Sequence, residues 1–318
     1  MKLYQNFIGI DIGKFKFVVG IYNNKQTKEY ENNHKGIAEF MKDHRHLLAN
    51  GLCILETTGG YEMELLLTLC DQKFAVHRAN SYKVKSFIRS LGNEAKTDAL
   101  DAKALALYGF ERCDRIELFK PQSKKMLELY ELVGRRNDLK QIVIAEKNRL
   151  KAPKGKLIRT SCTTVIRMLT QEIEKISDKI NALIAKDEIL KEKKEVLKTI
   201  PGIGDIVANE LLAFLPELGT VDRRKIASLT GLAPRSNDSG TIKGYRRTVN
   251  GRNCIKPILF VAAMAARNSK TGMKDFYERM IERGKKKMVA LVALMRKIIV
   301  IANARLRDLQ RANGAIKI

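Results

Sequence analysis

The stretch FIGIDIGKFKFVVGIY, residues 7–22, decides the fold that the sequence predicts. Its aromatic and β-branched residues form two runs, Phe7–Ile12 and Phe15–Tyr22, which the tight turn Asp11-Ile12-Gly13-Lys14 joins. Such runs are typical of β-strands, so the stretch predicts two paired strands at the start of a sheet. Asp11 ends the first strand, either as a functional carboxylate on a rigid sheet or as a turn residue bonded to its own backbone.

Short strands and helices alternate through the first 115 residues. Further strands are predicted at Cys53–Glu56 and Phe74–His77. Helical apolar spacing occurs in Lys35–Leu48, Tyr61–Leu69 and Ala95–Phe110. The order β-β-α-β-α-β, followed by a helix, predicts an α/β layer domain over residues 1–115.

Long, charged helices follow from about Gln122 to Leu197, within a predicted connector over residues 116–197. Apolar residues with the heptad spacing 3-4-3-4-3 lie at Ile166, Leu169, Ile173, Ile176, Ile180 and Leu183. This seam predicts an antiparallel helical hairpin or a coiled coil that connects two domains. Two heptads are also compatible with an ordinary amphipathic helix packed on its own domain, so dimerisation through the seam stays open.

The last segment, 198–318, is predicted to be all-α, with helices at 205–215, 222–229, 254–267, 273–283 and 286–310. Only the polar, basic loop Pro234–Arg252 interrupts it. The segment opens with Pro201-Gly202-Ile203-Gly204, which resembles a helix-hairpin-helix turn. In such a turn, backbone N–H groups around Gly202 and Gly204 receive a DNA phosphate. The alternative is a flexible connector between helices.

Composition points to a nucleic-acid partner. The chain has 60 Lys and Arg against 35 Asp and Glu, a formal charge of +25 and a pI near 9.9. Residues 196–318 alone hold 24 basic and 9 acidic residues, a net charge of +15, so much of the phosphate-binding surface is expected there. The five cysteines lack metal-site spacing, which argues against disulfides and zinc and favours a reducing cytosol. We expect no membrane attachment.

Four acids in order predict a metal site. Glu56 ends a strand as Asp11 does, so the two carboxylates can meet at one edge of a sheet. Asp98 and Asp101 are three residues apart on a helix and share a face, where their mutual repulsion makes sense if a cation lies between them. Oxygen ligands without cysteine favour Mg²⁺ or Mn²⁺, and two such ions can clamp a phosphodiester during in-line displacement. The alternative is a solvated helix face.

The loop Gly231–Gly244 contains two serines, Ser236 and Ser239, among turn residues. A loop serine is usually a turn or cap residue. It becomes a phosphoryl acceptor only where cations hold the phosphate and its proton has an acceptor. Basic candidates for contacts with nucleic acid flank it at Arg235, Lys243, Arg246, Arg247 and Arg252.

These motifs together resemble a known family, the DEDD transposases of bacterial insertion sequences, which include Piv-type DNA invertases and bridge-RNA-guided recombinases. The resemblance covers nearly the whole chain. It rests on the motifs FIGIDI (7–12), ETTGGY (56–61), KTDALDA (96–102), PGIG (201–204), GLAP (231–234), Ser239-Gly240 and LVALMRK (291–297).

The resemblance implies an N-terminal RuvC-like domain of RNase H-like fold, a coiled-coil connector and an all-α C-terminal transposase domain. It implies that Asp11, Glu56, Asp98 and Asp101 bind metal and that Ser239 is the nucleophile, chosen over Ser236 by its match to Ser-Gly. It further implies a covalent phosphoserine link to DNA, strand exchange through a four-way junction, a homodimer or tetramer, and a noncoding bridge RNA that selects donor and target DNA. The expected location is the bacterial cytoplasm, at the nucleoid.

Three rival functions remain. An actin-like ATPase or sugar kinase also begins with a strand and Asp-Ile-Gly, but the second glycine-rich phosphate loop and the adenosine motif of those enzymes are missing from the sequence. A non-catalytic nucleic-acid-binding protein would use the acids structurally. A RuvC-like junction resolvase would cleave with metal-activated water and would not use Ser239.

Overall fold

The computed structural model describes residues 3–92, 97–152, 154–241 and 244–314. The chain divides into two compact units, Met1–Gln122 and Ser123–Ile318. The boundary lies seven residues after the predicted end of the first domain, so residues 116–122 of the predicted connector belong to the first unit and residues 123–197 to the second. None of the helices in the described ranges combines the length and apolar character needed to cross a membrane.

The first unit is built on a five-stranded mixed sheet with the strand order β3-β2-β1-β4-β5. β1 pairs antiparallel with β2 and parallel with β4, β2 pairs antiparallel with β3, and β4 pairs parallel with β5. The strands are β1 (Asn6–Ile12), β2 (Lys16–Ile21), β3 (Thr27–Glu31), β4 (Gly51–Glu56) and β5 (Ala75–Ala79). The predicted α/β layer organisation is therefore confirmed.

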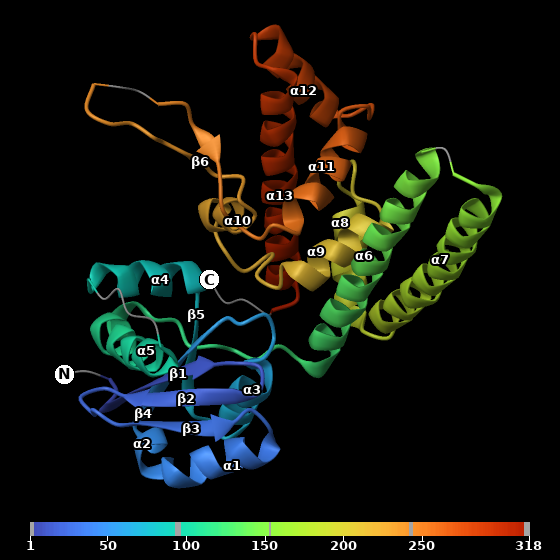
Figure 1. Cartoon of the computed structure of the whole chain (residues 1–318). Coiled ribbons are helices and arrows are strands. Elements are labelled where there is room, and N and C mark those ends of the chain that lie inside the picture. The colour runs from blue at the N-terminus through green and yellow to red at the C-terminus, as the bar shows by residue number, and fades with distance from the viewer. Residues whose placement is uncertain (1–2, 93–96, 153, 242–243, 315–318) are drawn as a thin grey trace. The chain divides into compact units, whose positions relative to one another are not determined.

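Helices cover both faces of this sheet (Figure 1). One face carries α1 (His34–Asp43), α2 (Arg45–Ala49) and α3 (Met63–Asp71), which bury Phe40 and Leu66 against Ile8 and Ile10. The other carries α4 (Ser81–Ser90) and α5 (Asp98–Arg112), which bury Val84 and Leu105 with Phe7 and Ile54. A short 3₁₀ turn, Cys113–Arg115, follows α5.

Glycines bring α5 unusually close to the sheet. A Cβ at Gly9 of β1 would lie 2.0 Å from the Ala102 carbonyl oxygen, and one at Gly20 of β2 would lie 2.9 Å from the Ala102 carbonyl carbon. A Cβ at Gly109 would lie 2.2 Å from Cδ1 of Ile54. A side chain at Gly9 or Gly20 would collide with the backbone of α5, so these two glycines fix the position of α5 on the sheet, while Gly109 packs against the Ile54 side chain.

The second unit begins with a hairpin of two long helices, α6 (Lys124–Lys151) and α7 (Lys156–Ala185), which lie side by side in Figure 1. Ile176, Ile180 and Leu183 of the heptad seam share a buried cluster with Leu129 and Val133 of α6. The seam is thus used within the chain, as an antiparallel hairpin.

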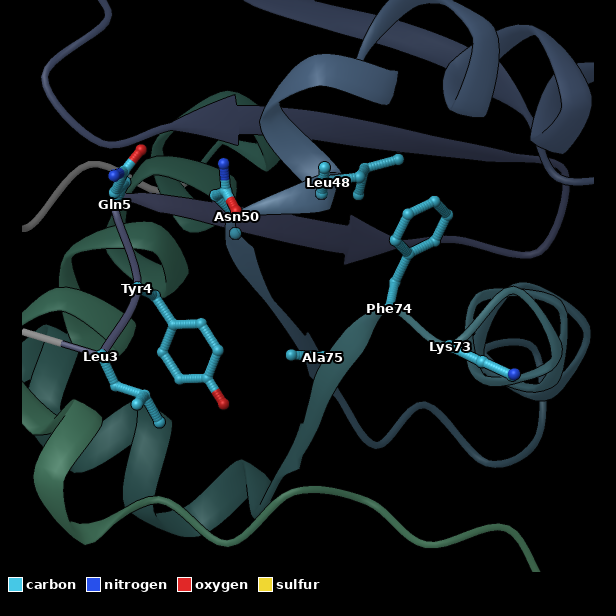
Figure 2. Close-up of a pocket in the computed structure, with 10 residues that line it drawn as sticks. Leu3, Tyr4, Gln5, Leu48, Asn50, Lys73, Phe74 and Ala75 are labelled. Carbon is cyan, nitrogen blue, oxygen red and sulfur yellow. The ribbon is translucent and has the colours of Figure 1, made fainter.

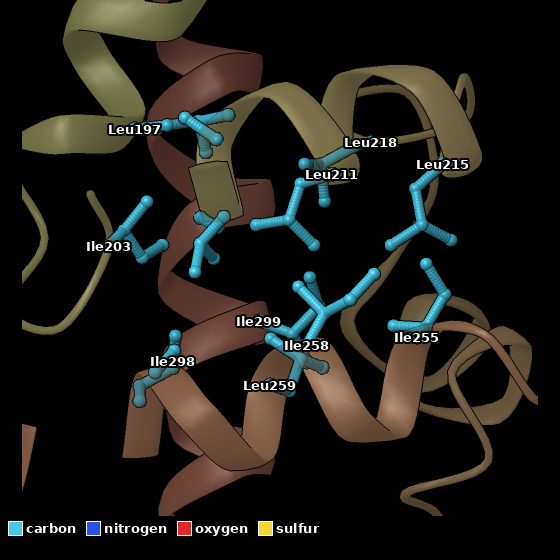
Figure 3. Close-up of a cluster of buried hydrophobic side chains, with 14 of the residues drawn as sticks. Leu197, Ile203, Leu211, Leu215, Leu218, Ile255, Ile258, Leu259, Ile298 and Ile299 are labelled. Carbon is cyan, nitrogen blue, oxygen red and sulfur yellow. The ribbon is translucent and has the colours of Figure 1, made fainter. Parts of the chain in front are cut away.

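The remaining helices are α8 (Glu188–Lys198), α9 (Asp205–Phe214), α10 (Arg223–Leu229), α11 (Ile255–Ala266), α12 (Gly272–Glu282) and α13 (Lys287–Ala312). Their buried leucines and isoleucines, among them Leu211, Leu259 and Ile298, form one core (Figure 3). Each predicted C-terminal helix is present, with ends that shift by one or two residues. The predicted all-α character needs one correction, because the basic loop contains the short antiparallel pair β6 (Pro234–Arg235) and β7 (Arg247–Thr248).

A buried ion pair ties the hairpin to this core. Arg136 of α6 is 2% exposed, and its guanidinium donates to a carboxylate oxygen of Glu210 on α9 at 2.5 Å. Two buried charges are stable only when paired, because each loses its hydration. The hairpin is therefore held to the helical core by charge as well as by apolar packing.

Candidate active site and nucleic-acid interface

The two strand-end acids lie next to each other at the carboxyl edge of the parallel strands. Ile10 of β1 pairs in register with Leu55 of β4, so Asp11 and Glu56 come directly after paired residues. Neighbouring strands are about 4.8 Å apart. Both acids point toward α5, because Gly9 and Ile54, two residues before them, contact that helix and side chains alternate between faces.

α5 delivers the other two acids to the same edge. The helix runs antiparallel to β1, since Gly109 lies near Phe7 while Ala102 and Ala106 lie near Gly9. Asp11 lies two residues beyond Gly9 along β1, a distance of about 7 Å. The same distance along α5 corresponds to four to five residues. Counted back from the segment Ala102–Ala106, this places the first turn of α5, with Asp98 and Asp101, near Asp11.

The side chains of the four acids are not arranged as a complete metal-binding site. Among the described residues, which include all four acids, no three His, Cys, Asp or Glu side chains lie together in a way that could hold a metal ion. Carboxylates repel one another without a cation between them. Asp98 is exposed and the other three are half-buried, so their rotamers have room to turn. The donor set itself, four carboxylates without cysteine or histidine, fits Mg²⁺ or Mn²⁺.

Glu62 is a functional candidate that the sequence did not reveal. It is fully buried after the loop that follows Glu56 and accepts hydrogen bonds from the N–H groups of Thr58 (3.2 Å) and Gly60 (2.9 Å). Arg78 of β5 binds its other oxygen through Nε (3.1 Å) and Nη2 (2.5 Å). The only signal in the sequence was an acid two residues after Gly60, and that signal does not indicate Arg78 as its partner.

Charge and hydrogen bonding make Glu62 strongly acidic. Burial alone would raise the pKa of Glu62, but hydrogen bonds from its own backbone N–H, from Arg78 and from the loop outweigh burial and lower the pKa to about 2. Gly59 and Gly60 have φ of +78° and +121°, which suits glycine. The buried carboxylate therefore fixes the loop that leads out of Glu56.

We predict that Glu62→Gln lowers the free energy of unfolding of the first unit by about 3 kcal/mol at pH 7. This is the free energy that corresponds to lowering the pKa of Glu62 from 4.5 to about 2 on folding. Because the folded pKa is depressed, this stabilisation is complete above pH 4.5 and fades as the pH falls toward 2. Urea unfolding followed by far-ultraviolet circular dichroism measures it. Glu64→Gln, an exposed neighbour, is the matched control. A difference between wild type and Glu62→Gln that does not change with pH would contradict this role.

A surface pocket of about 240 Å³ lies at the opposite edge of the sheet (Figure 2). Gln5, Gly51 and Ala75 line it where β1, β4 and β5 begin. Tyr4 and Phe74 also line it. Asp11 and Glu56 lie at the other ends of β1 and β4, so this pocket is not part of the candidate active site.

The Pro201-Gly202-Ile203-Gly204 turn joins α8 to α9 as predicted, but it is not a loose connector. Gly202 has φ of +90°, and a Cβ there would lie 2.1 Å from the Ala262 carbonyl oxygen. Gly204 is the N-cap residue of α9 and is exposed. Asp205 beside it pairs with Lys194 (3.0 Å) and Lys198 (3.3 Å), which lower its pKa and neutralise its charge at the start of α9.

Ser239 lies exposed on the hairpin loop between β6 and β7, as does Ser236. Asp238 accepts a hydrogen bond from the Gly244 N–H at 3.1 Å, which links the two sides of the loop. The root of the loop is closed tightly: a Cβ at Gly251 would lie 2.1 Å from the Gly231 nitrogen. The loop therefore presents Ser239 to solvent from a rigid base.

The basic candidates around the loop divide into two groups. Arg235, Arg246 and Arg247 are exposed and available to a polyanion. Arg252 has a structural role that the sequence did not predict, because its guanidinium donates to both carboxylate oxygens of Glu217 and to the Phe214 carbonyl oxygen. Lys243 lies outside the described residues.

Comparison with known proteins assigns the family. Residues 8–153 match the model of DEDD transposases of the IS110 type, described as "Transposase", and residues 194–278 match the model "Transposase IS116/IS110/IS902 family". The chain belongs to the IS110 family of DEDD transposases. The first match contains all four acids, and the second contains the PGIG turn and Ser239.

Curated relatives of this IS110-family protein agree with that assignment. The chain is 28% identical over 313 residues to the "Pilin gene-inverting protein" of Moraxella lacunata and, equally, to that of Moraxella bovis, and the similarity covers 96% of each chain. It is 27% identical over 197 residues to the "Insertion element IS110 uncharacterized 43.6 kDa protein" of Streptomyces coelicolor, covering 61% of this chain and 46% of the relative.

Proposed function

We propose that this IS110-family protein is a DNA recombinase that cleaves and exchanges strands with the help of divalent metal ions and a serine nucleophile. The observation that carries the proposal is the convergence of Asp11, Glu56 and the first turn of α5 at one edge of the sheet. The names of the relatives support the coarser activity, since they describe gene inversion and insertion elements.

The first unit is proposed to be an RNase H-like domain of the RuvC type, over residues 1–115. Two features of the sheet support this proposal: the strand order β3-β2-β1-β4-β5, and the division of the sheet into an antiparallel half (β1, β2, β3) and a parallel half (β1, β4, β5). Residues 116–197 are the proposed connector, and 198–318 the proposed transposase domain.

Asp11, Glu56, Asp98 and Asp101 would hold the metal, Mg²⁺ or Mn²⁺. A bound ion of this kind neutralises charge that develops on a phosphodiester during displacement. The chain's own part is to hold four carboxylates near that phosphate: two on rigid strands, and two on a helix whose position Gly9 and Gly20 fix.

Ser239 is the proposed nucleophile. Its Oγ would form a bond to phosphorus as the bond from phosphorus to the leaving strand's oxygen breaks, and the hydroxyl proton would pass to a base or water. The exposed Arg235, Arg246 and Arg247 would neutralise the phosphate, because charge-assisted hydrogen bonds from Arg suit phosphate oxygens. The adduct would conserve the energy of the phosphodiester bond for rejoining.

The proposed partners are donor and target DNA, a noncoding bridge RNA and further copies of this chain in a homodimer or tetramer. The charge of +25 supports a polyanionic partner. The cytoplasm, at the nucleoid, is the proposed location.

Recombination in cells tests the proposal and its dependence on metal. We expect the protein to rearrange a plasmid that carries the DNA flanking its own coding region, with new junctions detected by amplification and sequencing. In purified form the reaction should stop when EDTA removes divalent cations and resume on addition of Mg²⁺ or Mn²⁺. Full activity in EDTA would exclude the metal mechanism.

A further inference from the structure

The free end of the α6–α7 hairpin, residues 147–171, has a charge unlike that of the rest of the hairpin. It contains seven basic residues and no acid: Lys147, Arg149, Lys151, Lys154, Lys156, Arg159 and Arg167. The remainder of α7, residues 172–185, has three acids and two lysines. Glu146, the nearest preceding acid, pairs with Arg149. This hairpin tip is therefore a concentrated positive surface.

One face of α7 within the tip is hollowed. Arg159, Thr160, Thr163, Thr164 and Arg167 line a shallow surface hollow of about 300 Å³. All five residues are exposed. Their spacing places them on one side of the helix, with an arginine at each end and short threonines between. Long side chains are thus missing from the middle of a basic face, which lets a bulky ligand come close to the helix.

The two arginines are eight residues apart, or about 12 Å along the helix axis. That separation is comparable to the width of the major groove of B-form DNA, about 12 Å, whereas the major groove of duplex RNA is narrow. Arg159 Nε donates to the Lys154 carbonyl oxygen at 3.2 Å, which orients its guanidinium. The hydroxyls of Thr160 and Thr163 donate to the carbonyl oxygens of Lys156 (3.0 Å) and Arg159 (2.8 Å), and each can rotate to donate to a phosphate oxygen instead.

We propose that the hairpin tip binds the sugar-phosphate backbone of duplex DNA, with Arg159 and Arg167 contacting phosphates on the two sides of a groove. The inference rests on the proposed function, because it assigns a DNA contact to a recombinase. The protein would then have two phosphate-binding surfaces: the hairpin tip on the connector and the basic loop around Ser239. A second copy of the chain fits the tip poorly, since two surfaces of the same strong charge repel each other.

The salt dependence of DNA binding tests the contact. For the full-length chain and a short duplex of arbitrary sequence, the logarithm of the binding constant should fall linearly with the logarithm of salt concentration. In the double variant Arg159→Gln/Arg167→Gln the slope should decrease by about 2, because each lost phosphate contact removes about 0.9. With equal binding of the two proteins at about 1 M salt, the same relation gives a loss of affinity of about sixtyfold at 0.1 M salt. Fluorescence anisotropy measures both.

The same helix offers a matched control. Lys175→Gln/Lys179→Gln removes two exposed charges from the mixed-charge half of α7 and should leave the slope nearly unchanged. Thr164→Glu, which places a carboxylate in the hollow, should weaken DNA binding like the arginine variant. Gln and Glu are good helix formers, so circular dichroism should show the same helix content in all variants.

Several outcomes would overturn the tip contact. The tip contact would be excluded if Arg159→Gln/Arg167→Gln had the same salt dependence of DNA binding as the wild type. A loss of binding confined to duplex RNA would assign the tip to RNA, and a changed molar mass in light scattering with unchanged DNA affinity would assign it to contacts between copies. Each of these leaves the proposed recombinase standing. If the wild-type chain binds no duplex DNA at all, both proposals fail.

Discussion

Asp11→Asn is expected to reduce recombination at least about a thousandfold. A metal ion supplies several kcal/mol of charge stabilisation, and each 1.36 kcal/mol changes the rate tenfold, so losing about 4 kcal/mol gives this factor. The amide keeps the size and shape of the carboxylate but removes the charge that attracts a divalent cation. Junction formation in cells and cleavage of a labelled duplex by the purified protein measure the loss.

The control separates chemistry from folding and binding. Asp71→Asn makes the same change at an exposed residue that ends α3, away from the carboxyl edge of the sheet, and should retain wild-type activity. Asp11→Asn should bind duplex DNA nearly as the wild type does, because phosphate contacts come from basic residues. Recombination by Asp11→Asn within tenfold of wild type would remove Asp11 from the proposed metal site.

Ser239→Ala is expected to abolish recombination and the covalent adduct, because the variant has no oxygen to attack phosphorus. The loss of recombination in Ser239→Ala should match the loss in Asp11→Asn to within the detection limit. When two residues act in the same step, removing either one stops that step, and the effects of the two substitutions do not add. With a DNA substrate whose cleavage cannot be reversed, the wild type should form a protein–DNA adduct that survives denaturation. Peptide mapping should locate that adduct at Ser239.

Ser236→Ala is the matched control, three residues earlier on the same exposed loop. It should recombine DNA at close to the wild-type rate. An adduct at Ser236 would move the nucleophile by three residues. Strand cleavage by Ser239→Ala at the wild-type rate would favour a junction resolvase that uses metal-activated water.

The sequence predicted most of the fold because apolar periodicity marks the buried elements. The strand predicted at Phe7–Ile12 is β1, Asn6–Ile12, and the helix predicted at 254–267 is α11, Ile255–Ala266. The edge strand β3, Thr27–Glu31, was missed because only Tyr30 in it is buried, and the other residues are polar. α4, Ser81–Ser90, was missed for the same reason, with Val84 and Phe87 as its buried residues.

The candidate site was predictable only in part. That strand-end acids meet at a sheet edge follows from parallel strand geometry, so the sequence placed Asp11 and Glu56 correctly beside each other. The role of the Glu62 carboxylate could not be predicted, because Glu62 precedes helix α3 and its partner Arg78 is sixteen residues away on strand β5. Roles that depend on a distant partner cannot be inferred from local patterns.

The closed root of the Ser239 loop has a consequence for engineering this protein. Gly231 and Gly251 meet without room for a side chain, and Arg252 clamps the chain just beyond them. Changes of length or sequence within residues 236–246 are therefore insulated from the helical core. We therefore expect that this loop, with Ser239 in it, can be exchanged between relatives without a change in the melting temperature of the recipient.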